Sequence, residues 1–165
     1  MTDLIDEAVV REVSKALGVS TLSPHTPVRV RMPDTRNSIT HKFTVADHEG
    51  YIVASVYPNG EIGEMFFTMA KEGSTISGLF DTIATTTSVG LQHGVPLFAF
   101  LNRWVDQRFE PSGFTKNANI REVSSIMDYI ARWLAIKFLS KKDIAKLNIA
   151  LQDRGLLPIG TKPQE

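Results

Sequence analysis

Three short segments in the first half of the chain alternate apolar and polar residues, which is the pattern of half-buried β-strands. They cover about residues 39–46, 51–57 and 62–69, where valine, isoleucine and phenylalanine favour extended backbone. The tripeptides His48-Glu49-Gly50 and Pro58-Asn59-Gly60 separate them and are typical of turns, the second being a strong hairpin signal. The sequence therefore predicts an antiparallel β-meander of about three strands.

Apolar residues at helical spacing dominate the rest of the chain. Residues 2–17 predict a short amphipathic helix whose apolar stripe consists of Leu4, Ile5, Val9, Val10, Val13 and Leu17. A proline-containing linker or strap follows over 20–37. Beyond the three strands, helices are predicted over 74–93, 96–104, 119–139 and 141–154, with a loop at 108–115. Strands followed by helices predict an α+β fold in which the meander packs against several helices.

The order of these elements divides the chain into three parts. Its 165 residues are enough for one domain with a core of its own. We expect an amino-terminal helix and linker over 1–28, the main domain over 29–139, and a carboxy-terminal helix and tail over 140–165.

The composition excludes several chemistries. The chain has 18 Lys and Arg residues against 18 Asp and Glu residues, and this balance argues against DNA binding. Cysteine is absent, which excludes disulfides, a thiolate nucleophile and a zinc ribbon. The 4 histidines lack metal-ligand spacing, so we expect no metal or other cofactor. Since there is neither an apolar run of membrane-spanning length nor a secretion signal, we expect a cytoplasmic protein.

One segment, residues 69–78, points to a ligand. Gly73 would allow a sharp turn between a strand and a helix, and Ser74 or Thr75 would cap that helix. Exposed amides and the positive end of the helix dipole favour an anion there, and Lys71 adds a charge. Helix capping alone would explain the same residues.

Other residues extend this candidate site. The full set of candidate ligand-binding residues is Lys71, Gly73, Ser74, Thr75, Arg31, Arg36, Lys42, Arg108 and, for stacking on a base, Phe109. The sequence leaves open whether the outlying basic residues reach the same cleft or are solvated surface charges.

Seven colinear segments carry a resemblance to a known family. They lie at 32–34, 38–43, 48–52, 67–79, 94–97, 108–115 and 125–134, and include MAKEGSTISG at 69–78 and RFEPSGFT at 108–115. Over roughly residues 29–139 the chain resembles the carboxy-terminal region of adenosylcobalamin-dependent (class II) ribonucleotide reductases. In those enzymes the region belongs to the TSCPD family, named for a Thr-Ser-Cys-Pro-Asp turn. Residues 74–78 stand in the place of that turn.

The resemblance implies a TSCPD-like fold and a link to nucleotide metabolism. The resemblance also shows which reductase parts the chain lacks. Nothing in the chain resembles the barrel that binds cobalamin and substrate. The cysteine-bearing tail that regenerates reducing equivalents is absent as well. Since such a reductase needs a thiyl radical and a thiol pair, we expect a stand-alone protein that is not an enzyme.

Three functions remain open. The first is a non-catalytic nucleotide-binding or accessory module, whose partners are a nucleotide, a reductase catalytic chain, or both. The second is a stand-alone protein, for example of phage origin, that sequesters a nucleotide-derived signal molecule at an oligomer interface. The third is a structural domain that self-associates, with Trp104, Trp133 and Phe138 as either interface anchors or core residues. We expect a homo-oligomer.

Overall fold

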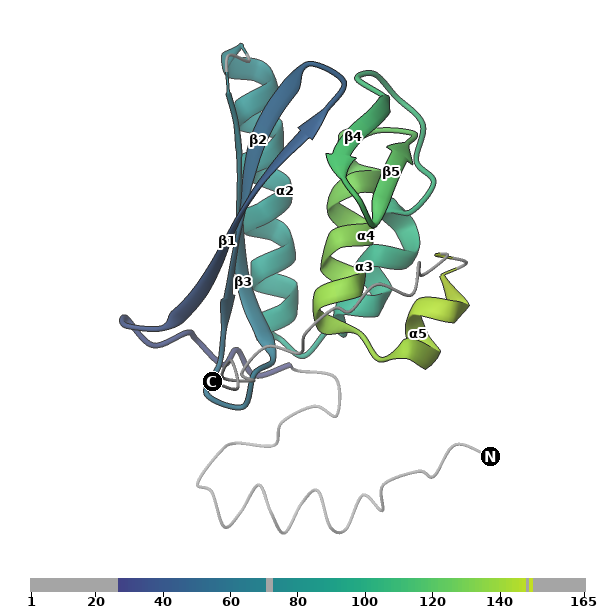
Figure 1. Ribbon diagram of the computed structural model, residues 1–165. Helices are drawn as coiled ribbons and strands as arrows, with labels where there is room; N and C mark the ends of the chain where they lie inside the picture. Colours follow the sequence, from purple (N-terminus) through teal and green to yellow (C-terminus); the bar gives the residue numbers. More distant parts are fainter. Residues whose placement is uncertain (1–26, 71–72, 148, 150–165) are drawn as a thin grey trace, which may run out of the picture.

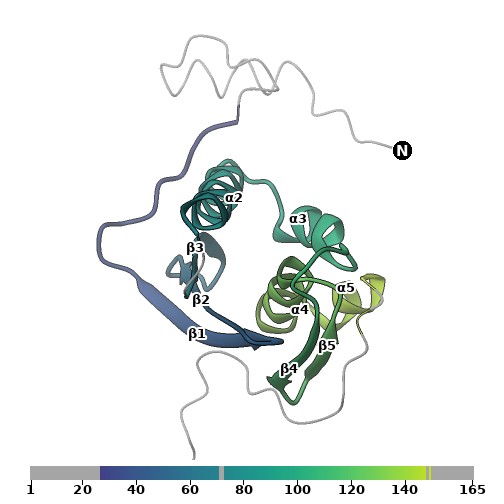
Figure 2. The same ribbon diagram turned by 90° about the horizontal axis from the view of Figure 1, so that it is seen from above.

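A computed structural model describes residues 27–70, 73–147 and 149, which form a sheet with its helices gathered on one side (Figures 1 and 2). The elements are β1 (Asn37–Val45), β2 (His48–Val56), β3 (Ile62–Met69), α2 (Ser74–Gln92), α3 (Leu97–Trp104), β4 (Gly113–Asn117), β5 (Ile120–Val123), α4 (Ile126–Phe138) and α5 (Lys141–Lys146). The strand order is β3-β2-β1-β4-β5, and neighbouring strands are antiparallel. The predicted α+β class is therefore confirmed.

The predicted meander corresponds to β1–β3, but its first turn lies elsewhere. Val45 pairs with His48, so the turn consists of Ala46 and Asp47, with Ala46 at a φ of 49°. The prediction of a turn at 48–50 was wrong. Gly50 lies inside β2 opposite Phe43, where a larger residue would not fit, because an added Cβ would come within 2.6 Å of the Phe43 ring. The hairpin predicted at 58–60 is confirmed, and Gly60 adopts the left-handed φ of 86°.

Two further strands stand where a loop and a helix were predicted. β4 begins at Gly113 within the predicted loop, and β5 occupies 120–123, so the predicted helix over 119–139 was wrong at its start. The helix begins only at Ile126, because the Ser125 side chain accepts a hydrogen bond from the amide of Asp128 and caps it. The helix predicted over 141–154 is observed as Lys141–Lys146. The predicted helix at 2–17 and residues 150–154 lie outside the described part of the chain.

Helix α2 lies along the outer edge of β3 and hydrogen bonds to it through side chains. Ser88 Oγ accepts from the amide of Met65 at 3.0 Å, and Gln92 Nε2 donates to the carbonyl of Gly63 at 3.1 Å. Four residues of a helix rise about 6 Å and two residues of a strand about 6.8 Å, so the two polar side chains match the spacing of the strand. The helix thereby satisfies backbone groups that an edge strand would leave open.

The core lies between the sheet and the helices, and both tryptophans belong to it. Trp104 and Trp133 are only 9% and 4% exposed, and the ring of Trp104 meets Phe67 edge-on. Phe138 is partly buried against the same core. These rings are core residues, so the structure does not support their use as interface anchors.

The Ser88 contact yields the first prediction. Ser88→Ala should lower the free energy of unfolding by about 1–3 kcal/mol, because the buried amide of Met65 loses its acceptor. Urea denaturation measures this loss. Thr85→Ala, at an exposed position on the same helix, should stay within about 0.5 kcal/mol of the parent. Equal values for the two variants would show that the side chain does not secure the strand edge.

Candidate functional site

The segment predicted to bind an anion opens helix α2, but the capping prediction was wrong. Gly73 is the N-cap, and no side chain forms a capping hydrogen bond, so Ser74 and Thr75 lie in the first turn instead. The φ of Gly73 is −63°, a value open to any residue, so the turn does not depend on glycine. Gly73 and Thr75 are exposed. Lys71 lies outside the described residues.

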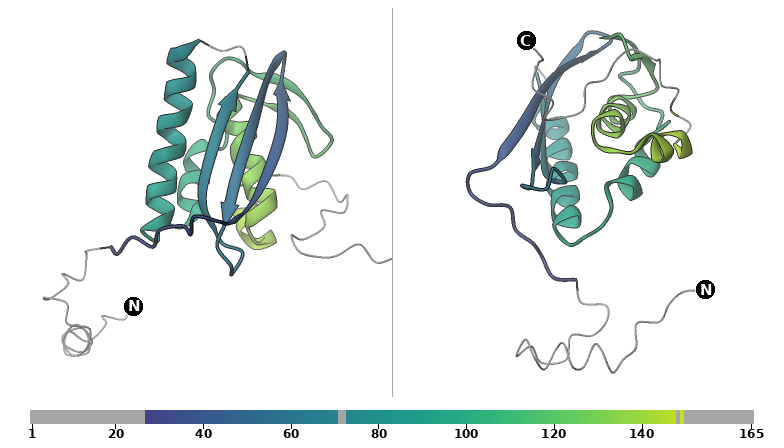
Figure 3. Two further views of the ribbon diagram at one scale, coloured as in Figure 1. Left: turned by 90° about the vertical axis from the view of Figure 1, so that its left-hand side faces the viewer. Right: turned by 60° about the horizontal axis from the view of Figure 1, so that its bottom comes forward.

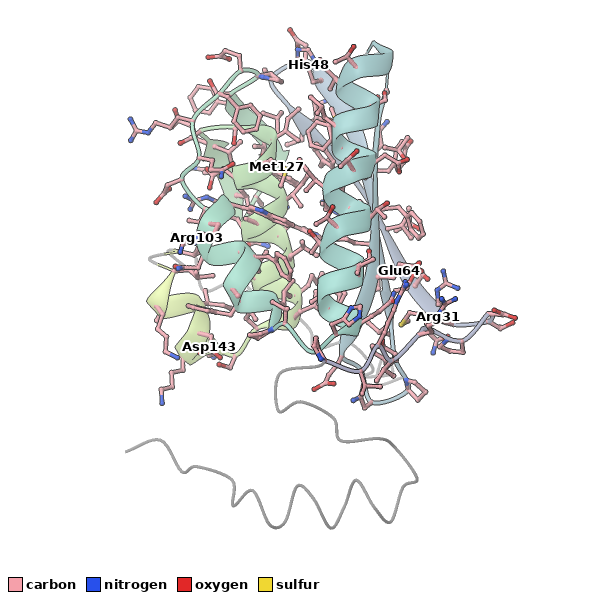
Figure 4. The ribbon with its side chains drawn as sticks, turned by 180° about the vertical axis from the view of Figure 1, so that it is seen from behind. Arg31, His48, Glu64, Arg103, Met127 and Asp143 are labelled. Atoms are coloured by element: carbon pink, nitrogen blue, oxygen red, sulfur yellow. The ribbon has the colours of Figure 1, made fainter. Side chains whose placement is uncertain are left out.

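Arg31 and Arg36 lie at the other end of α2. The amide of Val30 donates to the carbonyl of Gln92, which places this part of the chain at the last turn of the helix. Since α2 has 19 residues, its two ends are about 28 Å apart. Figure 4 shows Arg31 near Glu64, at the opposite end of the molecule from His48. These two arginines therefore do not join Gly73 and Thr75 in one site.

Two of the predicted cations already have acidic partners. Arg36 forms an ion pair with Glu64 on β3. Lys42 on β1 lies 3.1 Å from Glu49 on β2, and this hydrogen bond raises the pKa of Lys42. The same ammonium group lies 5.9 Å from the centre of the Tyr51 ring. Both side chains are therefore already paired with carboxylates.

Arg108 and Phe109, in contrast, line one cavity of about 640 Å³ between the α3–β4 loop, β5 and α4. Its lining is Arg108, Phe109, Glu110, Ser112, Gly113, Glu122, Val123, Ser124, Asp128 and Arg132. Arg108 is exposed and the Phe109 side chain is 43% exposed, so both are accessible from solvent. This is where the structure brings two predicted site residues together.

A buried carboxylate supports the floor of this cavity. Asp128 is 1% exposed, and it accepts hydrogen bonds from the amides of Asp106 at 2.9 Å and Ser124 at 3.0 Å. Arg132, one turn later on α4, donates to Asp128 at 2.8 Å and to Asp106 at 2.6 Å. Asp106 has a left-handed φ of 63°, a conformation that aspartate tolerates better than most residues. The Asp128–Arg132 pair thus fixes the loop that carries Arg108.

Most of the charges around the cavity already have partners. Arg132 is already paired with Asp128 and Asp106, and the Glu110 carboxylate accepts from the amide and hydroxyl of Ser112. Arg108, Glu110 and Glu122 are the other charged residues that line the cavity. A guanidinium binds oxyanions and an aromatic ring stacks on a base. The two glutamates outnumber the one remaining cation. An oxyanion with few negative charges therefore suits the cavity better than a triphosphate does.

Sequence reasoning missed the supporting residues of this cavity. Asp128 and Arg132 are spaced i, i+4, which favours an ion pair on a helix, and Ser125-x-x-Asp128 is a helix-start signal. Both signals were present within the segment predicted as one long helix. Glu110, Glu122 and Ser124 gave no such signal.

A second polar cluster, formed by His41, Asn117 and Tyr129, lies between β1 and α4. His41 stacks on Trp133 with ring centres 4.6 Å apart, and its Nε2 lies 2.9 Å from the hydroxyl of Tyr129. That hydroxyl also accepts from Asn117, so its own proton is free to bond to a neutral His41. Burial and then the charge of Lys137 lower the pKa of His41, while burial raises the pKa of Tyr129.

The described residues contain no group of three His, Cys, Asp or Glu side chains able to hold a metal ion. Among the helices of that part of the chain, none is both long and apolar enough to span a membrane.

Comparisons with known proteins agree with the motifs. The family model of the TSCPD domain matches residues 25–138. The chain belongs to the TSCPD domain family. A vitamin B12-dependent ribonucleotide reductase of Rhodopirellula baltica is 49% identical over 140 residues, which are 84% of this chain and 14% of the relative. Those of Streptomyces avermitilis and Bradyrhizobium diazoefficiens are 42% and 37% identical over 87% and 73% of this chain.

These matches confirm the resemblance to the reductases. The chain spans 14% of the length of the Rhodopirellula and S. avermitilis relatives and 10% of the Bradyrhizobium relative. No solved structure matches the chain.

The support of the cavity yields the second prediction. Asp128→Ala should lower the free energy of unfolding by about 3 kcal/mol, because Arg132 and two loop amides lose a buried partner. Thermal and urea denaturation measure the loss. Asp143→Ala is the matched control, since Asp143 follows its own N-cap serine by three residues but its side chain is 35% exposed and pairs with the exposed Lys146. It should hardly move the midpoint. Similar losses in both variants would contradict a special role for Asp128.

Proposed function

We propose that this TSCPD domain is a non-catalytic accessory module that acts with the catalytic part of a vitamin B12-dependent ribonucleotide reductase. The observations that support this most directly are the match of residues 25–138 to the TSCPD family model and the alignment of 140 residues with 14% of such a reductase. The 165 residues contain no cysteine, so they supply no thiol for the chemistry. The module would therefore contribute binding or regulation, and its partner would place it in the cytoplasm.

The outer face of β1–β3 offers a contact surface for such a partner. Figure 3 shows these three strands with the helices lying behind or beside them, so one face of the sheet stays open in the described part. Tyr51 on β2 and Phe66 on β3 are 39% and 43% exposed on this face, beside Val53. Aromatic side chains on an open surface are frequent anchors of protein interfaces.

The third prediction tests this association. The purified chain should form a complex with a Rhodopirellula-type reductase from which the matching 140-residue region has been removed. Light scattering after gel filtration detects the complex, and deoxynucleotide formation reports its effect on activity. Phe66→Ser should weaken binding roughly 30-fold, the equivalent of about 2 kcal/mol at an interface anchor.

Val28→Ser is the control for this experiment, because Val28 is also apolar and exposed but lies before β1. It should bind like the parent. Absence of a complex, together with an activity that is indifferent to the added chain, would rule out the accessory role.

A second candidate function rests on the cavity that Arg108 and Phe109 share. We propose that it binds a nucleotide or nucleotide-derived signal molecule without converting it, with Phe109 stacking on the base and Arg108 contacting an oxyanion. The two glutamates favour a monophosphate or a cyclic nucleotide over a triphosphate.

The fourth prediction follows from this assignment. In a thermal-shift panel, a monophosphate or cyclic nucleotide should stabilise the chain by about 2.7 kcal/mol at a hundredfold excess over its dissociation constant. Arg108→Ala should abolish the shift. Arg121→Ala should keep it, because Arg121 is exposed on β5 and does not line the cavity. Flat melting curves across the panel would exclude this candidate, and loss of the shift in both variants would place the ligand elsewhere.

A further inference from the structure

One flank of helix α2 carries apolar side chains that face solvent. Ile76 and Leu79 are 41% and 60% exposed, and Ile83, one turn further, is partly buried. Their i, i+3, i+7 spacing places them on one stripe, which we call the α2 flank. The neighbouring stripe, with Phe80 and Ala84, packs into the core.

The described neighbours of α2 do not cover this flank. The helix packs along β3, and α3 approaches it closely at the lower end, where an added Cβ on Gly90 would lie 2.6 Å from the Phe100 ring. Gly90 lies seven residues after Ile83 on the same stripe. The helices touch there, but Ile76 and Leu79 near the start of α2 stay exposed.

The chain enters the described structure next to this helix. Besides the bond from Val30 to Gln92, the side chain of Arg29 donates to Gln92 Oε1 at 2.9 Å. The described part of the chain therefore begins beside the last turn of α2, and 26 residues precede it in the sequence.

The preceding segment is long enough to cover the flank. Residues 2–17, predicted as a helix, would be about 24 Å long, against about 10 Å of α2 between Ile76 and Ile83. The nine residues 18–26 span up to about 30 Å when extended, so they allow the segment to reach any turn of α2.

The chemistry of the two surfaces is also complementary. The predicted apolar stripe consists of Leu4, Ile5, Val9, Val10, Val13 and Leu17. Such a stripe needs an apolar surface to cover it, and the α2 flank is an exposed apolar stripe within reach. We infer that residues 2–17 pack along the α2 flank of their own chain and cover Ile76 and Leu79.

The fifth prediction uses the absence of native cysteine, which makes engineered pairs unambiguous. In the full chain, Val9→Cys with Leu79→Cys should be joined by a short bismaleimide and remain a monomer that migrates faster on denaturing gels. Val9→Cys with Thr85→Cys is the matched control and should link at least tenfold less, because Thr85 lies on the opposite, polar side of α2.

A second measurement does not depend on the chosen pair. Val9→Asp with Val13→Asp in the full chain should speed amide hydrogen exchange in the first half of α2, since the covering segment is lost. Faster exchange there, with the intramolecular link, supports the inference. Exchange that stays at the parent rate, equal linking of both cysteine pairs, or linking only between two chains would overturn it, the last by identifying a second copy as the occupant.

Discussion

The hydrogen bonds from α2 to the edge of β3 position much of the molecule. Ser88 and Gln92 bind backbone groups of Met65 and Gly63, and they leave α2 no freedom to slide or rotate along the strand. This rotation decides that Phe80 and Ala84 face the core while Leu79 does not. Gln92 also binds Arg29, so the same contact fixes where the chain approaches β1. The closed edge is equally a defence against pairing with strands of other chains.

The sequence predicted those elements in which one local signal dominates. Strict alternation gave β1–β3, and helical spacing bounded by Gly73 and Gly94 gave α2 to within a residue. β4 and β5 were missed because they have only five and four residues, too few for a periodic signal to outweigh the helix that follows. Ile120 and Val123 are three residues apart, a spacing that fits a helix as well as this short strand. Gly50 was misread because its role is packing against Phe43, which only the tertiary structure shows.

The candidate site was predictable only where its members are neighbours in sequence. Arg108 and Phe109 share a cavity largely because they are adjacent, whereas Asp128 and Arg132 reach it through the fold. The type of a residue does not tell whether its charge is available. Arg36 and Lys42 seemed equivalent to Arg108 as cations, but Glu64 and Glu49 neutralise them. Glu49 lies on the strand next to Lys42, whereas Glu64 lies on β3, which is separated from β1 by β2, so the pairing follows from the tertiary fold and not from a motif.

The junction of β1 and β4 has a consequence for the behaviour of the molecule in acid. The two strands pair at a single position, Val45 with Thr115, and His41 fills the gap between β1 and α4. Its pKa lies below the ordinary 6.5 because it is half-buried and near Lys137. The unfolded chain therefore protonates His41 more readily than the folded chain does. As a result, the free energy of unfolding decreases as the pH falls from about 6.5 toward the lowered pKa of His41. Acidification would thus weaken the packing of β1 against α4 and β4. This is where the sheet has its shortest strand pairing.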